Sequence, residues 1–369
     1  MKIAIDGRVL FLSKIKGVGR YLQYLLKEFD RMNSQIDFYL LRNPRTTEAD
    51  KVEQYEHIQT IDLPAPSDFI WEQFTVSRFI RKNKVDVYHG PANTVGALTR
   101  CVKIVTLHDA MSHRFARSWG MLENAYWNIV QRNAYRSVDG FITPTQFAKR
   151  QLIDELQIPD EKIKVVYHGI SNKFGRAPDS AVNEWRSKYG LDKPYIFVAG
   201  ARLPRKNIAT VLKAFELLGS RVEKYDLVIT GVIGLDIVEK ILDAMKMKHC
   251  VKLLPHLDEG ELISAYSGAE LFVFPSLEET FGFPPLEAMA CGAPVVASNA
   301  SCIPEVVGDG AELVDCRNPK PLSETIFKIL GSNAAKNDLR ERGWKRAECF
   351  SWKRACDETL KIYESSWKK

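Results

Sequence analysis

Two glutamates lie eight positions apart in the segment PSLEETFGFPPLEAMACGAPVVAS, residues 275–298. Glu279 follows an apolar run typical of a strand, and Glu287 follows Pro284 and Pro285, which favour the first turn of a helix, where we place Glu287. The free N–H groups at such a helix end attract phosphate, whereas carboxylates repel it, so we expect the glutamates to accept hydrogen bonds from neutral sugar hydroxyls. The other interpretation, more common for single glutamates, is that Glu279 is a solvated loop residue and that Glu287 only complements the helix dipole.

Three cations lie on a short loop in GARLPRKN, residues 200–207, directly after another apolar run. They are Arg202, Arg205 and Lys206. Arginine offers a planar fork and lysine a point charge, so together they can hold a diphosphate. Taken alone, a loop of this composition is more often a solvated surface.

A glycine-rich segment, KGVGRY, lies between the first apolar run and the first amphipathic stretch. Gly17 and Gly19 would let the backbone approach a ligand, and Arg20 is a candidate phosphate contact. The other interpretation is a tight turn between a strand and a helix, because a lone Gly-x-Gly is a weak signal.

His108 ends an apolar run in TLHDAMSHRF, and Asp109 follows it. A single histidine at a strand end is more often a hydrogen-bonded core residue than a site residue. His113, Arg114 and Arg117 come shortly afterwards on a basic loop. Two interpretations of this loop are equally good: its cations bind an acidic acceptor molecule, or they only face solvent.

The elements that must position these residues alternate between short β-branched runs and longer amphipathic stretches, which predicts an α/β fold with doubly wound parallel sheets. We predict two Rossmann-like domains, 1–170 and 171–350, facing a cleft, with a linker at 171–180 and a terminal helix at 351–369. Ligands of such sheets bind at the carboxyl ends of the strands, where the residues above lie. The expected strands are 2–6, 37–41, 86–90, 103–109, 139–144, 164–169, 195–200, 226–231, 250–255, 270–275 and 293–298.

Length and composition exclude several classes of protein. The 369 residues are 45% hydrophobic and 27% charged, which is ordinary for a globular chain and unlike a disordered one. The net charge of +6 lies almost wholly before residue 170 and is too small for a nucleic-acid-binding arm, but it suits an anionic partner. Seven scattered cysteines predict a reduced compartment without structural zinc, and no apolar run is long enough to span a membrane. We expect a cytoplasmic protein that is at most peripherally bound to the inner face of the membrane.

The segment with the two glutamates resembles, almost residue for residue, the Glu-x7-Glu signature of retaining GT-B glycosyltransferases of family 4. The resemblance implies that Glu279 contacts the donor sugar and Glu287 the ribose of the nucleotide. It places Phe281, Gly282 and Phe283 in the same donor site.

The resemblance extends to the other segments. It implies that Lys206 holds the donor diphosphate, with Arg202 and Arg205 as alternatives for a second cation. The family's arginine commonly follows the glycine directly, where this chain has Ala201, and Pro-Arg-Lys-Asn resembles bacterial mannosyltransferase-like members. His108 would face the transferred sugar or the acceptor, with Asp109 as a weaker candidate.

Further implications concern the loops. The Gly17, Gly19 and Arg20 loop would lie near the donor phosphates and the acceptor, and residues 351–369 would cross back onto the first domain. His168, where the family usually has asparagine, is assigned to the interdomain turn and not to catalysis.

Together these features predict a retaining transferase that moves a hexosyl group, preferably mannose from GDP-mannose, to a glycan or lipid-linked acceptor in surface polysaccharide or lipopolysaccharide biosynthesis. We assign catalytic roles to His108, Glu279 and Lys206. No Asp-x-Asp triplet occurs, so we expect no metal and no cofactor besides the nucleotide sugar. The alternatives are a nucleotide-sugar epimerase, a sugar phosphorylase, or a non-catalytic two-domain sugar-binding protein.

Overall fold

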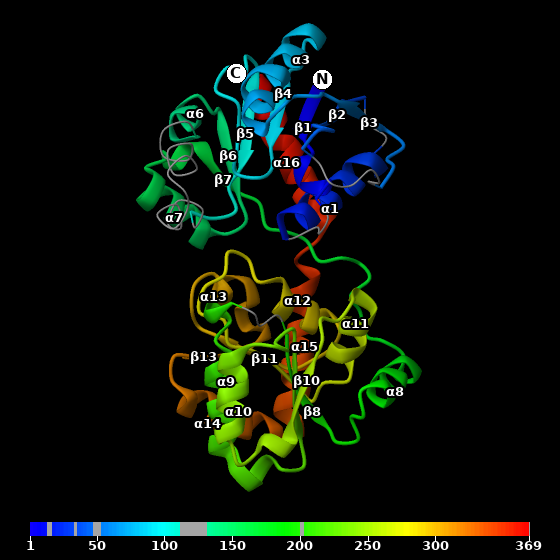
Figure 1. The fold of residues 1–369 in the computed structure, drawn as a ribbon, viewed down its shortest axis with the longest axis vertical. Helices are drawn as coiled ribbons and strands as arrows, with labels where there is room; N and C mark the ends of the chain where they lie inside the picture. The colour runs from blue at the N-terminus through cyan, green and yellow to red at the C-terminus, as the bar shows by residue number, and fades with distance from the viewer. Residues whose placement is uncertain (13–16, 33–34, 47–52, 111–130, 200–202, 369) are drawn as a thin grey trace. The chain divides into compact units, whose positions relative to one another are not determined.

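The computed structural model describes residues 1–12, 17–32, 35–46, 53–110, 131–199 and 203–368. The chain divides into two compact units. The first consists of Met1–Gly169 and Ser351–Lys369, and the second of Ile170–Phe350. Each unit contains one sheet covered by helices (Figure 1).

The first unit is built on a seven-stranded sheet in the order β3-β2-β1-β4-β5-β6-β7, with every neighbouring pair parallel. The inner strands are buried along nearly their whole length, as parallel strands must be when helices cover both faces. The strands are β1 (Lys2–Asp6), β2 (Asp37–Arg42), β3 (Ile58–Asp62), β4 (Val87–Gly90), β5 (Val102–Thr106), β6 (Gly140–Thr143) and β7 (Ile163–Val165).

Helices of the first unit connect these strands and include the C-terminal segment. A π-helical turn, Trp71–Thr75, joins two of them into one continuous helical stretch. The helices are α1 (Gly17–Arg31), α2 (Asp68–Ile70), α3 (Val76–Asn83), α6 (Arg132–Arg136), α7 (Gln146–Leu156) and α16 (Trp352–Trp367). None of the described helices is long and apolar enough to cross a lipid bilayer.

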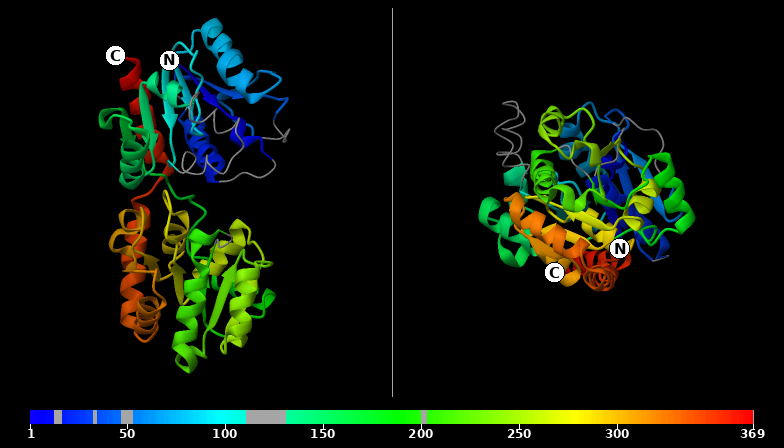
Figure 2. Two further views of the ribbon diagram at one scale, coloured as in Figure 1. Left: turned by 60° about the vertical axis from the view of Figure 1, so that its left-hand side comes forward. Right: turned by 90° about the horizontal axis from the view of Figure 1, so that it is seen from below.

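The second unit repeats the architecture with a six-stranded parallel sheet in the order β10-β9-β8-β11-β12-β13 (Figure 2). Its strands are β8 (Tyr195–Val198), β9 (Asp226–Thr230), β10 (Val251–Leu254), β11 (Leu271–Phe274), β12 (Val295–Ser298) and β13 (Glu312–Val314). Its helices are α8 (Asp179–Lys188), α9 (Ile208–Leu218), α10 (Asp236–Ala244), α11 (Glu259–Ser267), α12 (Phe283–Ala290), α13 (Ile303–Val307), α14 (Pro319–Leu330) and α15 (Asn333–Glu348).

The predicted fold class is confirmed, because both sheets are parallel and doubly wound. In each sheet the order of the strands reverses once, between β1 and β4 and between β8 and β11. Such a reversal opens a crevice at the carboxyl ends of the two strands, where ligands bind. Two edge strands, β3 and β13, were not predicted from the sequence. β3 has exposed polar positions and β13 has only three residues, so the hydrophobic signal of each is weak.

The C-terminal helix α16 belongs to the first unit, where it packs on α1 and lies against β5 and β6. Trp352 stacks on Tyr24 with ring centroids 5.2 Å apart. Farther along the helix, the fully buried Tyr363 places its hydroxyl 2.7 Å from Nδ1 of His89 on β4. The helix therefore supplies both apolar cover and a buried hydrogen bond to the sheet.

We predict that Tyr363→Phe lowers the free energy of unfolding by about 1–2 kcal/mol, because His89 loses a partner inside the core. Urea denaturation of both proteins measures the difference. Trp367→Phe on the same helix is the control and should change little, because Trp367 is largely exposed. Equal stability of Tyr363→Phe and wild type would show that the hydroxyl does not anchor the helix.

Candidate active site

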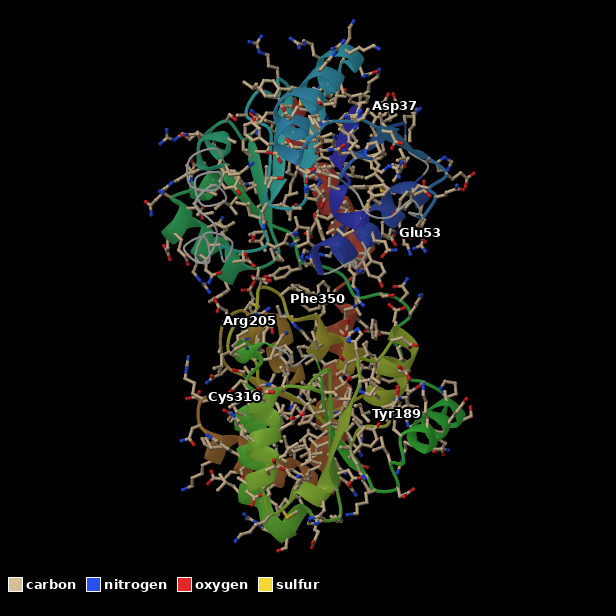
Figure 3. The ribbon with its side chains drawn as sticks, in the orientation of Figure 1. Asp37, Glu53, Tyr189, Arg205, Cys316 and Phe350 are labelled. Carbon is tan, nitrogen blue, oxygen red and sulfur yellow. The ribbon has the colours of Figure 1, made fainter. Side chains whose placement is uncertain are left out.

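The two cations after β8 meet the first glutamate after β11. Lys206 donates from Nζ to Oε1 of Glu279 over 2.6 Å, and Arg205 donates from Nη1 to Oε2 over 3.2 Å. Arg205, labelled in Figure 3, and Lys206 lie on a short 3-10 turn, Pro204–Lys206. Because β8 and β11 flank the point where the strand order reverses, this cluster lies at the expected ligand crevice of the second sheet.

Glu279 is held from several sides. Its side chain is mostly buried, and Ser276 donates from Oγ to Oε1 over 2.6 Å. Its backbone N–H donates to Oγ of Ser301 over 3.1 Å, while Sγ of Cys302 donates to its carbonyl. The carboxylate therefore has a fixed position and does not sample solvent as an ordinary loop residue would.

The loop with the cations is fixed by backbone and side-chain contacts. Arg205 donates from Nη1 to the carbonyl of Glu278 over 2.7 Å, and its own carbonyl accepts from the N–H of Leu277 over 2.8 Å. Asn207 adopts a left-handed conformation, φ 57°, and donates from Nδ2 to the carbonyl of Cys316 over 2.7 Å. An asparagine tolerates this conformation better than most residues, so the turn ends with Lys206 directed at Glu279.

The second glutamate, Glu287, lies farther along its helix than the sequence predicted. Gly282 has φ 88° and precedes α12, which begins at Phe283. Glu287 is therefore the fifth residue of the helix, in its second turn, and the assignment to the first turn is wrong. It is 91% buried and accepts from the hydroxyl of Tyr266 over 3.3 Å. The rings of Phe281 and Phe283 pack with centroids 5.0 Å apart beside the start of the helix.

In the first unit, His108 lies two residues beyond β5, which ends at Thr106 and not at 109 as expected. Its ring Nε2 lies 2.9 Å from the carbonyl of Pro91 and must donate to it, because a carbonyl only accepts. Its backbone N–H donates to Oδ1 of Asn93 over 3.0 Å. The tautomer that this geometry selects carries its proton on Nε2 and leaves Nδ1 as an acceptor.

An aromatic cluster surrounds His108. The ring of Tyr21 on α1 meets it edge-on with centroids 5.0 Å apart, and His168 lies 5.5 Å away. His168 also stacks on Trp352 of α16 at 5.7 Å. His168 directly precedes Gly169, the last residue of this stretch of the first unit, yet its ring is part of this cluster, which no feature of the sequence indicated.

Burial controls the charge of this cluster. Desolvation lowers the pKa of His108 to about 4, against the opposing effect of its hydrogen bond to Pro91. Desolvation, with a smaller contribution from His108, lowers the pKa of His89 to about 3 and that of His168 well below its ordinary value. The three rings are therefore neutral at pH 7.

The glycine-rich segment is helical. Gly17, Gly19 and Arg20 lie in the first turn of α1, so the prediction of a loop at these residues is wrong. Arg20 is exposed, and a Cβ added at Gly17 would meet nothing within 4 Å, so protein packing does not require glycine there. Asp109 is half-buried directly after His108.

Four of the predicted residues cannot be placed. Arg202, His113, Arg114 and Arg117 lie outside the described residues. The choice between Arg202 and Arg205 for the diphosphate therefore stays open, although Arg205 does reach Glu279. Among the residues that the structure describes, no group of three or more His, Cys, Asp and Glu side chains is arranged to hold a metal ion.

A buried ion network at the end of β1 was missed by the sequence analysis. Arg8 donates from Nη2 to Asp6 over 2.6 Å and to the fully buried Glu72 over 2.8 Å. Gln73 and Gln131 both donate to the other oxygen of Glu72. Arg8, Glu72 and Gln131 are far apart in the sequence, so only the folded chain brings them together.

Two family models match the chain in succession. Residues 15–174 match Glycosyltransferase Family 4, and residues 181–346 match Glycosyl transferases group 1, so that together they cover most of the chain. The chain belongs to glycosyltransferase family 4. The resemblance stated from the two glutamates is thereby confirmed, and the paired sheets of this glycosyltransferase form the GT-B fold.

Relatives and solved structures agree with this membership. O-antigen chain mannosyltransferase B of Escherichia coli is 29% identical over 294 residues, 77% of this chain and 76% of that one. The serotype-specific mannosyltransferase WbdA of Escherichia coli is 27% identical over 225 residues, 59% of this chain but 28% of WbdA. The crystal structure of Anabaena HepE with UDP-glucose has a TM-score of 0.76 at 16% identity, covering 99% of this chain and 100% of that one. The last likeness concerns the fold of the glycosyltransferase alone.

We predict that the glycosyltransferase loses stability as the pH falls from about 6.5 towards 4. The unfolded chain protonates its histidines near pH 6.5, whereas the folded pKa values are lower, so protons bind preferentially to the unfolded state. For each buried histidine that stays neutral, the free energy of unfolding should fall by about 2 kcal/mol between pH 7 and pH 5. Urea denaturation across this range measures the slope.

The matched pair for this experiment is His108→Gln and His256→Gln. His108→Gln should reduce the pH slope, whereas His256→Gln should leave it unchanged because His256 is exposed. The same slope in all three proteins would rule out a buried neutral His108.

Proposed function

We propose that this glycosyltransferase moves a hexosyl group, with retention of the anomeric configuration, from a nucleotide sugar to a glycan or lipid-linked acceptor. The observation that carries the proposal is the convergence of Lys206 and Arg205 on Glu279 at the strand reversal of the second sheet, beside the start of α12. Cations suit a diphosphate, and a fixed carboxylate suits sugar hydroxyls. A site that contains the cations and the carboxylate therefore suits the diphosphate and the sugar of a nucleotide sugar.

The same cluster suggests how the donor is recognised. Glu279 forms ion pairs with the two cations that the diphosphate would need. We propose that the diphosphate displaces the carboxylate from Lys206 and Arg205, which frees its oxygens to accept from the hydroxyls of the sugar. Binding of the phosphates and recognition of the sugar are thereby coupled through one side chain.

The chemistry then follows from charge. As the bond between the anomeric carbon and the diphosphate lengthens, negative charge grows on the leaving group. Lys206, Arg205 and the free N–H groups of α12 stabilise that charge more in the transition state than in the ground state, without a metal ion. In a front-face attack the donor phosphate takes the acceptor proton, and His108 helps to orient the sugar or the acceptor.

Mannose from GDP-mannose is the proposed donor, and a surface polysaccharide the proposed product. Support comes from the names of the relatives, since both Escherichia coli proteins are mannosyltransferases and one acts on the O-antigen chain. A nucleotide-sugar donor is supported by HepE, whose structure contains UDP-glucose.

We predict that Lys206→Ala and Glu287→Ala each lower the transfer rate by about 10²–10³, the usual cost of removing a group that stabilises developing charge or aligns the donor. Nucleotide release from GDP-mannose, UDP-glucose, UDP-N-acetylglucosamine and dTDP-rhamnose, with acceptor glycans, measures transfer. Lys213→Ala, an exposed lysine of α9, is the control. Full turnover in both variants would contradict the proposed site, and conversion of the donor without an acceptor would indicate an epimerase.

We further predict that Glu279→Gln binds the free nucleoside diphosphate about tenfold more tightly than wild type, because the competing carboxylate has lost its charge. Transfer should fall in the same variant, since the sugar hydroxyls meet one neutral amide oxygen in place of two charged carboxylate oxygens. Calorimetry with GDP and UDP measures the affinity, and Glu324→Gln, an exposed glutamate of α14, controls for net charge. Weaker or unchanged diphosphate binding would contradict the displacement.

A further inference from the structure

Large apolar side chains project into solvent from one face of the first unit. Phe69, Ile70 and Phe74 lie on the helical stretch formed by α2, the π turn and α3, and Leu98 lies on the loop after β4. Their exposed fractions are 46%, 39%, 56% and 55%. Side chains of this kind are costly in water, and several together mark a contact surface.

The π-helical turn brings these side chains together. A π turn contains more residues than an α turn, so Phe74, five positions after Phe69 and four after Ile70, returns to the same side of the helix. The opposite side is anchored in the core through Trp71 and Val76, which are fully buried. The apolar face is therefore a fixed feature of the helical stretch.

Leu98 is held next to this helical stretch. The N–H of Ala97 donates to Oε1 of Gln73 over 2.8 Å, and the hydroxyls of Thr99 and Ser77 lie 3.2 Å apart. The residues on both sides of Leu98 thus bond to the helical stretch, while Leu98 itself faces solvent.

The same helical stretch continues into a run of positive charge. Arg78, Arg81, Lys82 and Lys84 are all exposed, and residues 76–84 contain no acidic residue. Within the described part of the chain, these four side chains form no ion pair. Arg100, also exposed, extends the charge beside Leu98. Among the described residues these like charges have no acidic partner, which favours an extended anionic surface as their counterpart.

We propose that this face docks on a lipid bilayer that contains anionic lipids. The apolar side chains would enter the boundary between headgroups and acyl chains, and the cations would meet lipid phosphates around them, as in interfacial helices. A bilayer is favoured over an acidic protein because the charges from Arg78 to Lys84 are all positive and lie on long, exposed side chains, whereas Asp68, beside Phe69, is within 3.8 Å of Arg8. The surface is called the docking face below: Phe69, Ile70, Phe74, Arg78, Arg81, Lys82, Lys84, Leu98 and Arg100.

A buried ion pair gives the docking face a firm base. Glu72 lies within the π turn and is fully buried, where it accepts from Arg8 of the loop after β1 over 2.8 Å. The guanidinium of Arg8 also stacks over the ring of Trp71 at 4.5 Å. The helical stretch is thereby tied to the segment that follows β1, so its outward face cannot turn inward to hide the apolar side chains.

Co-sedimentation of the full chain with vesicles tests the proposal. The probes are vesicles of phosphatidylcholine alone and of phosphatidylcholine with phosphatidylglycerol. We expect binding to the anionic vesicles only, weakened by salt. Arg78→Glu with Arg81→Glu should reduce binding at least tenfold, and Phe69→Ser with Phe74→Ser should reduce it by a similar factor.

The matched control carries the same charge reversal on the second unit, Lys213→Glu with Lys240→Glu, both exposed lysines, and should bind as wild type does. Urea denaturation should show that each variant still folds cooperatively, since none of the substituted side chains belongs to the buried core. Equal loss in the control, equal binding to neutral vesicles, or no vesicle binding by wild type would overturn the proposal, the last in favour of a protein partner. Binding of GDP or UDP, measured on the same variants, is independent of this outcome.

Discussion

The contact on which the proposed donor site depends is the pairing of one carboxylate with two cations. Lys206 and Arg205 follow β8, Glu279 follows β11, and their hydrogen bonds join two loops that the chain separates by about seventy residues. Two neighbouring cations would repel each other without the carboxylate, and a buried carboxylate without cations would be unstable. Each group therefore holds the other in the place where a nucleotide sugar would need it.

The first unit differs from the second in the charge of its buried polar side chains. Its buried histidines are neutral, because burial holds His89, His108 and His168 in their uncharged form. Its charges are gathered in the separate Asp6, Arg8 and Glu72 network, which ties the helical stretch of the docking face to β1. Both units thus place charged groups at the end of a strand beside the reversal of strand order, and the first unit adds neutral rings that can form hydrogen bonds.

Comparison of sequence and structure shows where local patterns fail. The apolar runs located eleven strands, but not the partly polar edge strand β3 or the three-residue edge strand β13. Gly17 was expected in a loop and lies in a helix, because two glycines do not prevent a helix when the residues after them have an apolar face. Glu287 was placed one turn too early, since the left-handed Gly282 starts the helix before the prolines.

The doubly wound fold, the family and the segments proposed to carry the chemistry could all be predicted from the sequence, because they depend on periodicity and on residues close together in the chain. Which side chains meet could not be predicted in this way. The pairing of Lys206 with Glu279, the ring of His168 beside His108, and the hydroxyl of Tyr363 on His89 all join distant segments. Such contacts depend on how sheets and helices pack, and packing is set by the whole core rather than by any local run of residues.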